Sequence, residues 1–379
     1  MKISKIQLIG LLAVWFVIGG VTSSWLTRVL KPELLVIDQV MTNIEKKSFT
    51  NKQTRQQLAS AAVQAILSSI DDDYATFFDP QVTNQVLREF STGERGLIGI
   101  QGEMQAGQFV ITVVTPGMPA AEKGLLVGDV IVSIDGWQVS PTTNSMDVIR
   151  MVSSSQSPEA VIEIIRSAEK MTFAIPRQPV EAIQTKMLTD IAYIRFDIIS
   201  EETPNTLLQE LEKINKMKPM GIILDLRYNG GGLMESTRGV LDLFEKQGVA
   251  FYAKNSSDQL IPFLTRDGEI AEDIPLVVLT SGQTYSASET IAASLRENER
   301  AVLIGEKTHG KGSIVETIRL SDGSSIQISV ARWLSPLNQT DYEGQGVAPD
   351  VEFLNKFENG QDLMLAYAEK YLRDHALDN

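Results

Sequence analysis

The 379-residue chain contains no cysteine and only two histidines, His309 and His375. The absence of cysteine excludes disulfides, thiolate metal sites and a cysteine nucleophile. Two histidines, one of them close to the C-terminus, leave little material for a histidine zinc site or a serine-histidine triad. We therefore expect neither a metal nor a cofactor.

Positive charge is also scarce, because 34 lysines and arginines face 48 aspartates and glutamates, for a net charge of −14. Such a surface repels a phosphate backbone, so we expect no nucleic-acid partner. Hydrophobic residues make up 43% and charged residues 22%, which is the balance of a folded protein. The length predicts two or three domains.

Long apolar runs are absent except for one near the N-terminus. Ile6–Thr27 carries no charged residue for 22 residues, which at about 1.5 Å per residue is the span of a bilayer core. No clear small-x-small cleavage site follows it, so residues 1–31 are expected to be a membrane anchor, with a cleaved signal segment as the alternative. Basic residues flank the run on both sides and do not set its orientation.

Four further regions differ in their residue pattern. Residues 32–90 have the three- and four-residue apolar spacing of helices, and residues 91–179 are short β-rich runs separated by glycine and proline. Residues 180–355 alternate strands with helices, as in an α/β fold, and 356–379 are expected to form a C-terminal helix. The acidic run Asp71–Asp73 lacks calcium-loop spacing and is expected to be a solvated helix end.

A triple glycine follows the predicted strand Gly221–Leu226. Gly230, Gly231 and Gly232 precede a predicted helix, Leu233–Phe244, where backbone N–H groups favour a negative charge. The spacing fits neither a dinucleotide fingerprint nor a phosphate loop. An oxyanion site and a flexible turn both remain compatible with it.

A serine stands at the start of the helix predicted over Ser286–Arg296. The sequence Ser286-Ala287-Ser288-Glu289 follows a strand and a loop, and it is a Ser-x-x-Glu capping box. Taken alone, this pattern favours a helix cap over a nucleophile.

A lysine between two glycines follows the predicted strand Ala301–Ile304. The flanking glycines allow the chain to turn Lys311 inward, to a site where burial lowers its pKa. Only a neutral amine can accept a serine proton. Lys307 is the other nearby lysine that could accept this proton, although it is not flanked by glycines.

The β-rich region resembles a PDZ domain in two stretches. Leu97, Ile98, Gly99 and Ile100 match its carboxylate-binding loop, and Pro116–Gly136 matches its helix-turn-strand pattern. A glycine in such a loop lets consecutive N–H groups converge on a carboxylate, while the adjoining strand edge accepts a peptide strand. The four loop residues are therefore predicted to bind a chain end.

Together these motifs resemble the C-terminal processing peptidases, also called tail-specific proteases. The matching stretches are DDDYATFFDP, LDLRYNGGG, TYSASETIAASL, IGEKTHGKGS and GQGVAPDVEF, and the resemblance covers nearly everything after the first 31 residues. It implies an α/β class with a crotonase-like peptidase core, an inserted PDZ module and an N-terminal helical segment.

The same resemblance implies roles for individual residues. Ser286 would be the nucleophile and Lys311 the general base, and backbone N–H groups of Gly231, Gly232 and Ala287 would hold the oxyanion. The implied reaction is hydrolysis of peptide bonds near the C-termini of protein substrates.

One departure from the family pattern concerns Lys311. The family commonly carries a glutamine four residues after the lysine, whereas this chain has Val315, followed by Glu316. A valine cannot bind an amine, so another polar group replaces the glutamine, packing alone orients the lysine, or the protein is a weak or inactive peptide-binding scaffold. Phenylalanine is also commoner where His309 stands. A small-ligand or lipid-binding relative is a third, weaker alternative.

The expected partners are protein or peptide C-termini and, through the N-terminal segment, a membrane. A homo-oligomer is a further option. The expected location is the cell membrane, as a single-pass protein with its catalytic part outside the cytoplasm, or the exterior after signal cleavage.

Overall fold

The computed structural model describes residues 32–375, except 52, 116, 142, 144, 155, 156, 181, 267–269, 272, 359 and 360. The expected membrane segment, residues 1–31, lies outside the described residues. In the part that is described, no helix is both long and apolar enough to cross a bilayer. The chain divides into two units, residues 1–71 and 72–379.

The described part of the first unit is a pair of helices, α2 (Pro32–Lys47) and α3 (Arg55–Leu67). Helix α3 begins with a capping box, in which the Thr54 N–H donates to the Gln57 side chain at 2.8 Å. Arg55 at the start of α3 pairs with Glu45 of α2 at 2.8 Å, and also with Asp38. These ion pairs join the two helices.

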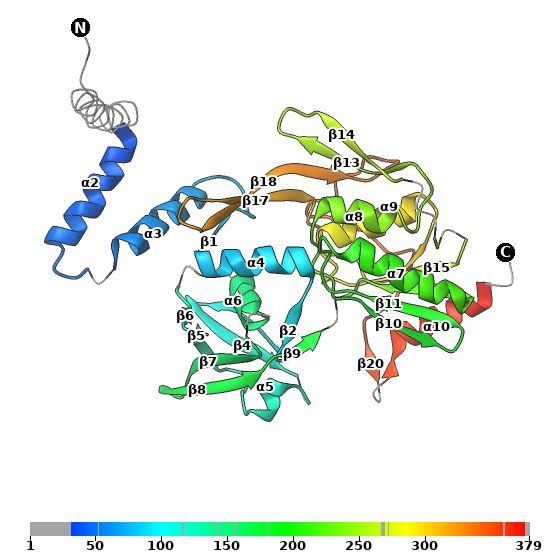
Figure 1. The fold of residues 1–379 in the computed structure, drawn as a ribbon, viewed down its shortest axis with the longest axis horizontal. Helices are drawn as coiled ribbons and strands as arrows, with labels where there is room; N and C mark the ends of the chain where they lie inside the picture. The colour runs from blue at the N-terminus through cyan, green and yellow to red at the C-terminus, as the bar shows by residue number, and fades with distance from the viewer. Residues whose placement is uncertain are drawn as a thin grey trace, which may run out of the picture. The chain divides into compact units, whose positions relative to one another are not determined.

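The PDZ region of the second unit is built on a six-stranded antiparallel sheet. Its strands run in the order β3-β4-β5-β7-β8, with β6 paired to β5, so β3 is an edge strand. They are β3 (Ile100–Gln105), β4 (Gln108–Val114), β5 (Val130–Ile134), β6 (Trp137–Gln138), β7 (Glu159–Arg166) and β8 (Glu169–Pro176). Helices α4 (Pro80–Thr92), α5 (Pro119–Glu122) and α6 (Ser145–Val152) accompany the sheet (Figure 1).

Alternate residues of these strands point into one core. Phe109 and Ile111 of β4 are fully buried there, and Val82 and Val86 of α4 pack in the same cluster. Helix α4 is thus part of the PDZ core. The helical segment expected over residues 32–90 is therefore divided, because its last part buries its apolar face against the PDZ sheet.

The α/β region expected over residues 180–355 contains a second six-stranded sheet, in the order β10-β11-β12-β15-β16-β19. In this sheet, β11, β12, β15, β16 and β19 are parallel to one another, and β10 pairs antiparallel with β11 at the edge. They are β10 (Gln184–Leu188), β11 (Ile191–Arg195), β12 (Gly221–Asp225), β15 (Leu276–Thr280), β16 (Val302–Gly305) and β19 (Val351–Glu352).

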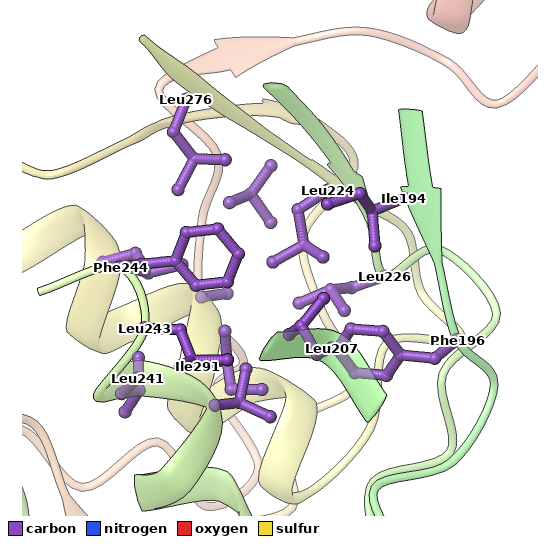
Figure 2. Packing of buried hydrophobic residues seen from close by; sticks show 14 of the residues in the cluster. Ile194, Phe196, Leu207, Leu224, Leu226, Leu241, Leu243, Phe244, Leu276 and Ile291 are labelled. Atoms are coloured by element: carbon purple, nitrogen blue, oxygen red, sulfur yellow. The ribbon is translucent and has the colours of Figure 1, made fainter. Parts of the chain in front are cut away.

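Both faces of this sheet are covered by helices, which confirms the expected α/β class. On one face, Ile194, Leu224 and their neighbours pack against α7 (Thr203–Lys216), α8 (Met234–Leu241) and α9 (Ala287–Glu297), as Figure 2 shows. On the other face, Tyr193, Ile223 and Val277 pack against α10 (Leu363–His375). The expected C-terminal helix thus begins at Leu363, after the short strands β20 (Phe357–Glu358) and β21 (Gln361–Asp362).

A smaller antiparallel sheet lies in the same unit. Strand β18 (Ser325–Leu334) pairs with β17 (Ser313–Arg319), with β13 (Val249–Asn255) and, at its other end, with β1 (Thr76–Phe78). Strand β14 (Leu260–Leu264) extends the sheet beyond β13. Because β1 precedes the PDZ sheet in sequence, the start of the second unit is held on a strand that comes some 250 residues later. Two more short strands, β2 (Arg95–Leu97) and β9 (Gln178–Val180), pair where the chain enters and leaves the PDZ sheet.

The three motifs singled out in the sequence follow three neighbouring parallel strands. The triple glycine comes after β12, Ser286 after β15 and Lys311 after β16. The carboxyl ends of parallel strands lie at one edge of a sheet, which is where α/β proteins build their sites. The sheet order therefore brings the three loops together.

We expect Gly305→Ala, at the end of β16, to destabilise the fold. Gly305 has φ +142°, and a Cβ there would lie 2.1 Å from the backbone carbonyl oxygen of Thr280. Strain plus this clash should cost about 2–4 kcal/mol, measured as a lower urea midpoint. Gly282→Ala is the control, since a Cβ at Gly282 meets nothing within 4 Å. Equal urea midpoints for the two variants would contradict the expected strain and clash at position 305.

Candidate functional site

Ser286 occupies a strained backbone conformation between β15 and α9. Its φ of 59° and ψ of −122° lie outside the regions that L-residues favour. Such strain costs about 1–3 kcal/mol and persists where the surroundings enforce it. A sharp strand-to-helix turn of this kind presents a side chain at the N-terminus of a helix, as does the nucleophile turn of α/β-hydrolases. The N–H of Glu289 bonds to the backbone carbonyl of Ser286 at 2.8 Å, so the main chain itself helps to cap α9.

The carboxylate of Glu289 joins the serine turn to the lysine loop. One of its oxygens, Oε2, accepts the backbone N–H groups of both Ser286 and Lys311, each at 2.8 Å. The other oxygen, Oε1, accepts the Gly310 N–H at 2.6 Å and the Thr308 hydroxyl at 2.5 Å. Glu289 is fully buried, and burial raises its pKa although its four donors favour the carboxylate. The sequence predicted only the bond to Ser286.

Asn229 fixes the triple-glycine turn to the same serine turn. Its Oδ1 accepts the Gly231 N–H at 2.8 Å and the Ser288 hydroxyl at 2.6 Å. Its backbone carbonyl accepts the Tyr285 N–H at 3.1 Å. Asn229 and Ser288 are both fully buried. Sequence reasoning missed both residues, although an asparagine before three glycines is a typical turn signal.

The backbone donors near Ser286 are fewer than the sequence predicted. The Gly231 N–H is already engaged by Asn229, which leaves it unavailable for an oxyanion. A Cβ placed on Gly231 would lie 3.0 Å from the Cβ of Ser286, so the glycine turn lies against the serine. Among the described residues, the N–H groups of Gly232 and Ala287 have no hydrogen-bond acceptor. These two are the donors that remain.

Lys311 is directed inward, as its flanking glycines predict. The residue is 7% exposed, whereas the competing Lys307 is exposed. Its backbone is held at both ends, because its N–H donates to Glu289 and its carbonyl accepts the indole N–H of Trp333 at 2.9 Å. Its Nζ lies 4.4 Å from the ring centroid of Tyr74 and 5.1 Å from that of Tyr285, the residue that precedes Ser286.

Burial and, to a smaller extent, the positive charge of Arg150 lower the pKa of the Lys311 amine to about 8. Three carboxylates act in the opposite direction. They are Glu343, Asp72 and Glu289. Arg150 belongs to α6, so the PDZ region contributes a charge that acts on this amine. A substantial fraction of Lys311 is therefore neutral near pH 8.

One feature of the sequence has a different environment from the one expected. Asp72 of the acidic run is not a solvated helix end, because its carboxylate binds Ser329 of β18. Val315 lies on β17 opposite Ser329, after an irregularity in the strand pairing. His309 is exposed, and its ring centroid lies 4.6 Å from that of Tyr285.

The predicted PDZ loop connects β2 and β3. Ile98 is buried in the PDZ core, and its carbonyl accepts the Ala120 N–H at 2.8 Å. Gly99 has φ +87°, and a Cβ there would lie 2.2 Å from Met118, so only glycine fits. In the described part of the chain, Ile100 begins the edge strand β3, on which the Met104 N–H already donates to the Ser145 hydroxyl at 2.9 Å.

A cavity of about 390 Å³ begins beside this loop. Its lining joins Leu97 of the PDZ loop with Gln184 of the edge strand β10. The remaining lining residues are Met118, Gln178, Pro179, Arg195 and Asp197. The cavity thus connects the predicted PDZ loop with the β10 edge of the parallel sheet. In the part of the chain that the structure describes, no group of three or more potential metal ligands is present.

Comparison with known proteins identifies the family. The family model for peptidase family S41 matches residues 190–353, and a PDZ domain model matches residues 96–176. A carboxy-terminal-processing protease of Bartonella bacilliformis is 30% identical over 334 residues, which cover 84% of this chain and 75% of that protein. The chain belongs to the carboxy-terminal processing proteases of peptidase family S41.

Two further carboxy-terminal processing proteases have a similar sequence identity to this chain. A carboxyl-terminal-processing protease of Synechocystis is 31% identical, covering 76% of this chain and 69% of that protein. The carboxy-terminal processing protease CtpA of Bacillus subtilis is 29% identical, covering 81% and 66%. The chain is thus a serine peptidase with a PDZ domain.

The fold of this S41 protease agrees with two solved structures. The photosystem II D1 C-terminal processing protease has a TM-score of 0.57 at 24% identity, covering 86% of this chain and 88% of the other. An S41-type protein of Bacteroides fragilis has a TM-score of 0.50 at 16% identity, covering 89% and 97%. These matches confirm the predicted fold, and the family models confirm the peptidase core and its PDZ module.

We expect Glu289→Gln to lower both stability and activity. A glutamine amide turns one acceptor oxygen into an NH₂ group that faces N–H donors, and each charge-assisted bond lost costs about 1.5–3 kcal/mol. Urea unfolding and peptide cleavage would measure the two effects. Glu299→Gln, at an exposed position beyond the end of α9, is the control. Wild-type cleavage by Glu289→Gln would mean that this carboxylate does not hold the site.

Proposed function

We propose that Ser286 is the nucleophile and Lys311 the general base of an S41 peptidase that cleaves proteins near their C-termini. The observation that carries this proposal is the shared oxygen of Glu289, which binds the backbone N–H groups of both residues at 2.8 Å. The two backbone nitrogens therefore lie within two hydrogen-bond lengths of each other. The strained turn of Ser286 and the buried amine of Lys311 supply the two chemical functions.

The proposed reaction is acyl transfer. Neutral Lys311 takes the hydroxyl proton as Ser286 Oγ attacks the scissile carbonyl carbon. The N–H groups of Gly232 and Ala287 stabilise the oxyanion, each by about 3 kcal/mol in comparable sites. The ammonium of Lys311 then gives its proton to the leaving amine as the C–N bond breaks. In the second half, Lys311 removes a proton from water as the water oxygen attacks the acyl-enzyme carbonyl carbon. Lys311 then returns this proton to Ser286 Oγ as the ester C–O bond breaks and the acid product leaves.

The PDZ region is proposed to receive the C-terminus of the substrate. Two observations support this role: the loop from Leu97 to Ile100 with its edge strand β3, and the cavity that connects the loop to β10. A gating role is supported by Arg150 of α6, whose charge acts on Lys311. Peptide binding that moves α6 would change the pKa of the base.

The proposed location is the cell membrane, with the peptidase outside the cytoplasm. It is supported by the 22 uncharged residues from Ile6 to Thr27. Release after signal cleavage is the alternative, and the size of the protein recovered from the membrane fraction distinguishes the two.

A catalytically weak peptide-binding scaffold is the second candidate function. Val315 is the observation that favours it, because the glutamine common in the family is missing. Cleavage assays separate the two functions directly.

The decisive assay is cleavage of a protein with an unstructured apolar C-terminus. Ser286→Ala and Lys311→Ala are each expected to lower kcat about 10³-fold or more, since each removes one half of the acyl-transfer machinery. Lys307→Ala is the matched control, because this lysine lies four residues before Lys311 and is exposed. A wild type that is no faster than both variants would support the scaffold.

A second assay tests the PDZ site with two substrates that differ only at the last residue. A peptide with a free C-terminal carboxylate should be cleaved with a KM about tenfold lower than its C-terminal amide, because converging N–H groups bind the charged form better. Both peptides should have the same KM if the loop does not read chain ends.

A further inference from the structure

The absence of a glutamine at position 315 raises the question of what holds the Lys311 amine. Val315 on β17 pairs with Ser329 on β18. A polar group that reaches this part of the sheet comes from the start of the second unit in sequence. It belongs to the acidic run that precedes β1.

Asp72 binds the residue that pairs with Val315. Its Oδ2 accepts the Ser329 N–H at 2.8 Å, and its Oδ1 accepts the Ser329 hydroxyl at 2.8 Å. Oδ1 also accepts the N–H of Tyr74 at 3.0 Å. One carboxylate therefore fixes the segment from Asp72 to Tyr74 on the strand that faces position 315.

Tyr74 places its ring on the amine and its hydroxyl on the lysine loop. The ring centroid lies 4.4 Å from Lys311 Nζ, and the hydroxyl donates to Glu343 Oε1 at 2.7 Å. The other oxygen of Glu343 accepts the Ser313 hydroxyl at 2.8 Å and the Gly312 N–H at 3.1 Å. The ring is thus fixed to the two residues that follow Lys311.

We propose that Asp72 and Tyr74 are positioning residues for Lys311, in place of the glutamine that related proteases carry four residues after their lysine. The aromatic face attracts the ammonium that forms during the reaction and keeps water from the amine. The carboxylate of Asp72 holds the ring segment in place and adds a negative charge near the amine. The inference rests on the proposed role of Lys311 as the base.

The pH dependence of the Lys311 amine is set by the rings and charged side chains around it. Two rings and four charged side chains surround it, and His309 stands beside one of the rings. The rings are Tyr74 and Tyr285, and the charged groups are Arg150, Glu343, Asp72 and Glu289. The wild-type profile of kcat/KM against pH should rise through about pH 8, where Lys311 loses its proton.

The test compares the pH profiles of two variants that should move in opposite directions. Tyr74→Leu removes the ring's attraction for the ammonium but opens the amine to water, which favours the ammonium. Because burial is the largest cause of the lowered pKa, the second effect should be the larger one, and the rise should shift to higher pH by about 0.5 unit or more. Asp72→Asn removes a negative charge, which favours the neutral amine, so the rise should shift to lower pH. General damage to the fold cannot produce opposite shifts.

Rates give a second readout. Tyr74→Leu should lower kcat about tenfold or more at saturating pH, with little change in KM, because the amine loses its position. Tyr74→Phe keeps the ring and should keep the wild-type pH profile, with only a few-fold loss of kcat. Asp73→Asn, at the exposed neighbouring position, and Tyr252→Leu, in β13, are the controls and should match the wild type.

Wild-type profiles for both Tyr74→Leu and Asp72→Asn would overturn the inference, as would shifts in the same direction. The profile of Lys311→Ala separates this failure from that of the proposed function. If Lys311→Ala is inactive while the two profiles are unchanged, only the positioning role is wrong. If Lys311→Ala cleaves like the wild type, Lys311 is not the base and both proposals fail.

Discussion

The buried carboxylate of Glu289 is the interaction on which the site depends. It accepts four hydrogen bonds, from Ser286, Thr308, Gly310 and Lys311, and thereby joins the loops that follow β15 and β16. The proposed proton transfer from Ser286 to Lys311 requires a fixed connection between the two loops that carry these residues. A buried carboxylate with no spare acceptor capacity provides it, and its removal would leave unpaired N–H groups inside the protein.

The parallel sheet brings the loops of the site together, and the Glu289 carboxylate then fixes two of them to each other. Leu276, Val278 and Leu224 pack on one face while Val277, Leu279 and Ile223 pack on the other, so the strands are held from both sides. Their carboxyl ends bring the glycine turn, the serine turn and the lysine loop to one edge. Asn229 ties the first of these to the second with a hydrogen bond to Ser288 and another to the Tyr285 N–H. The strained backbone of Ser286 is stable because its neighbours are fixed on both sides.

Local signals in the sequence were sufficient to locate the main elements of the site. The glycines around Lys311 predicted an inward lysine, the Ser-x-x-Glu pattern predicted the start of α9, and the strand–helix alternation predicted the α/β class. What could not be predicted are contacts between segments that are far apart in sequence. Tyr74 and Glu343 are separated by 269 residues, and Asp72 and Ser329 by 257. No local periodicity reports such a contact, so the sequence alone predicts a solvated acidic run. The oxyanion prediction included Gly231 because sequence shows where an N–H is placed but not that Asn229 already binds it.

We propose that the fold lowers the pKa of the Lys311 amine to about 8, so that a fraction of it is neutral near physiological pH, close to Ser286. The most direct measurement is the titration of the Lys311 amine itself, followed by the ¹³Cε resonance of the side chain in the Ser286→Ala protein, with Lys311→Arg used to identify the signal. The account predicts a pKa of about 8. A pKa near 10.4, the value of an exposed lysine, would contradict it, because such an amine remains charged and cannot accept the serine proton.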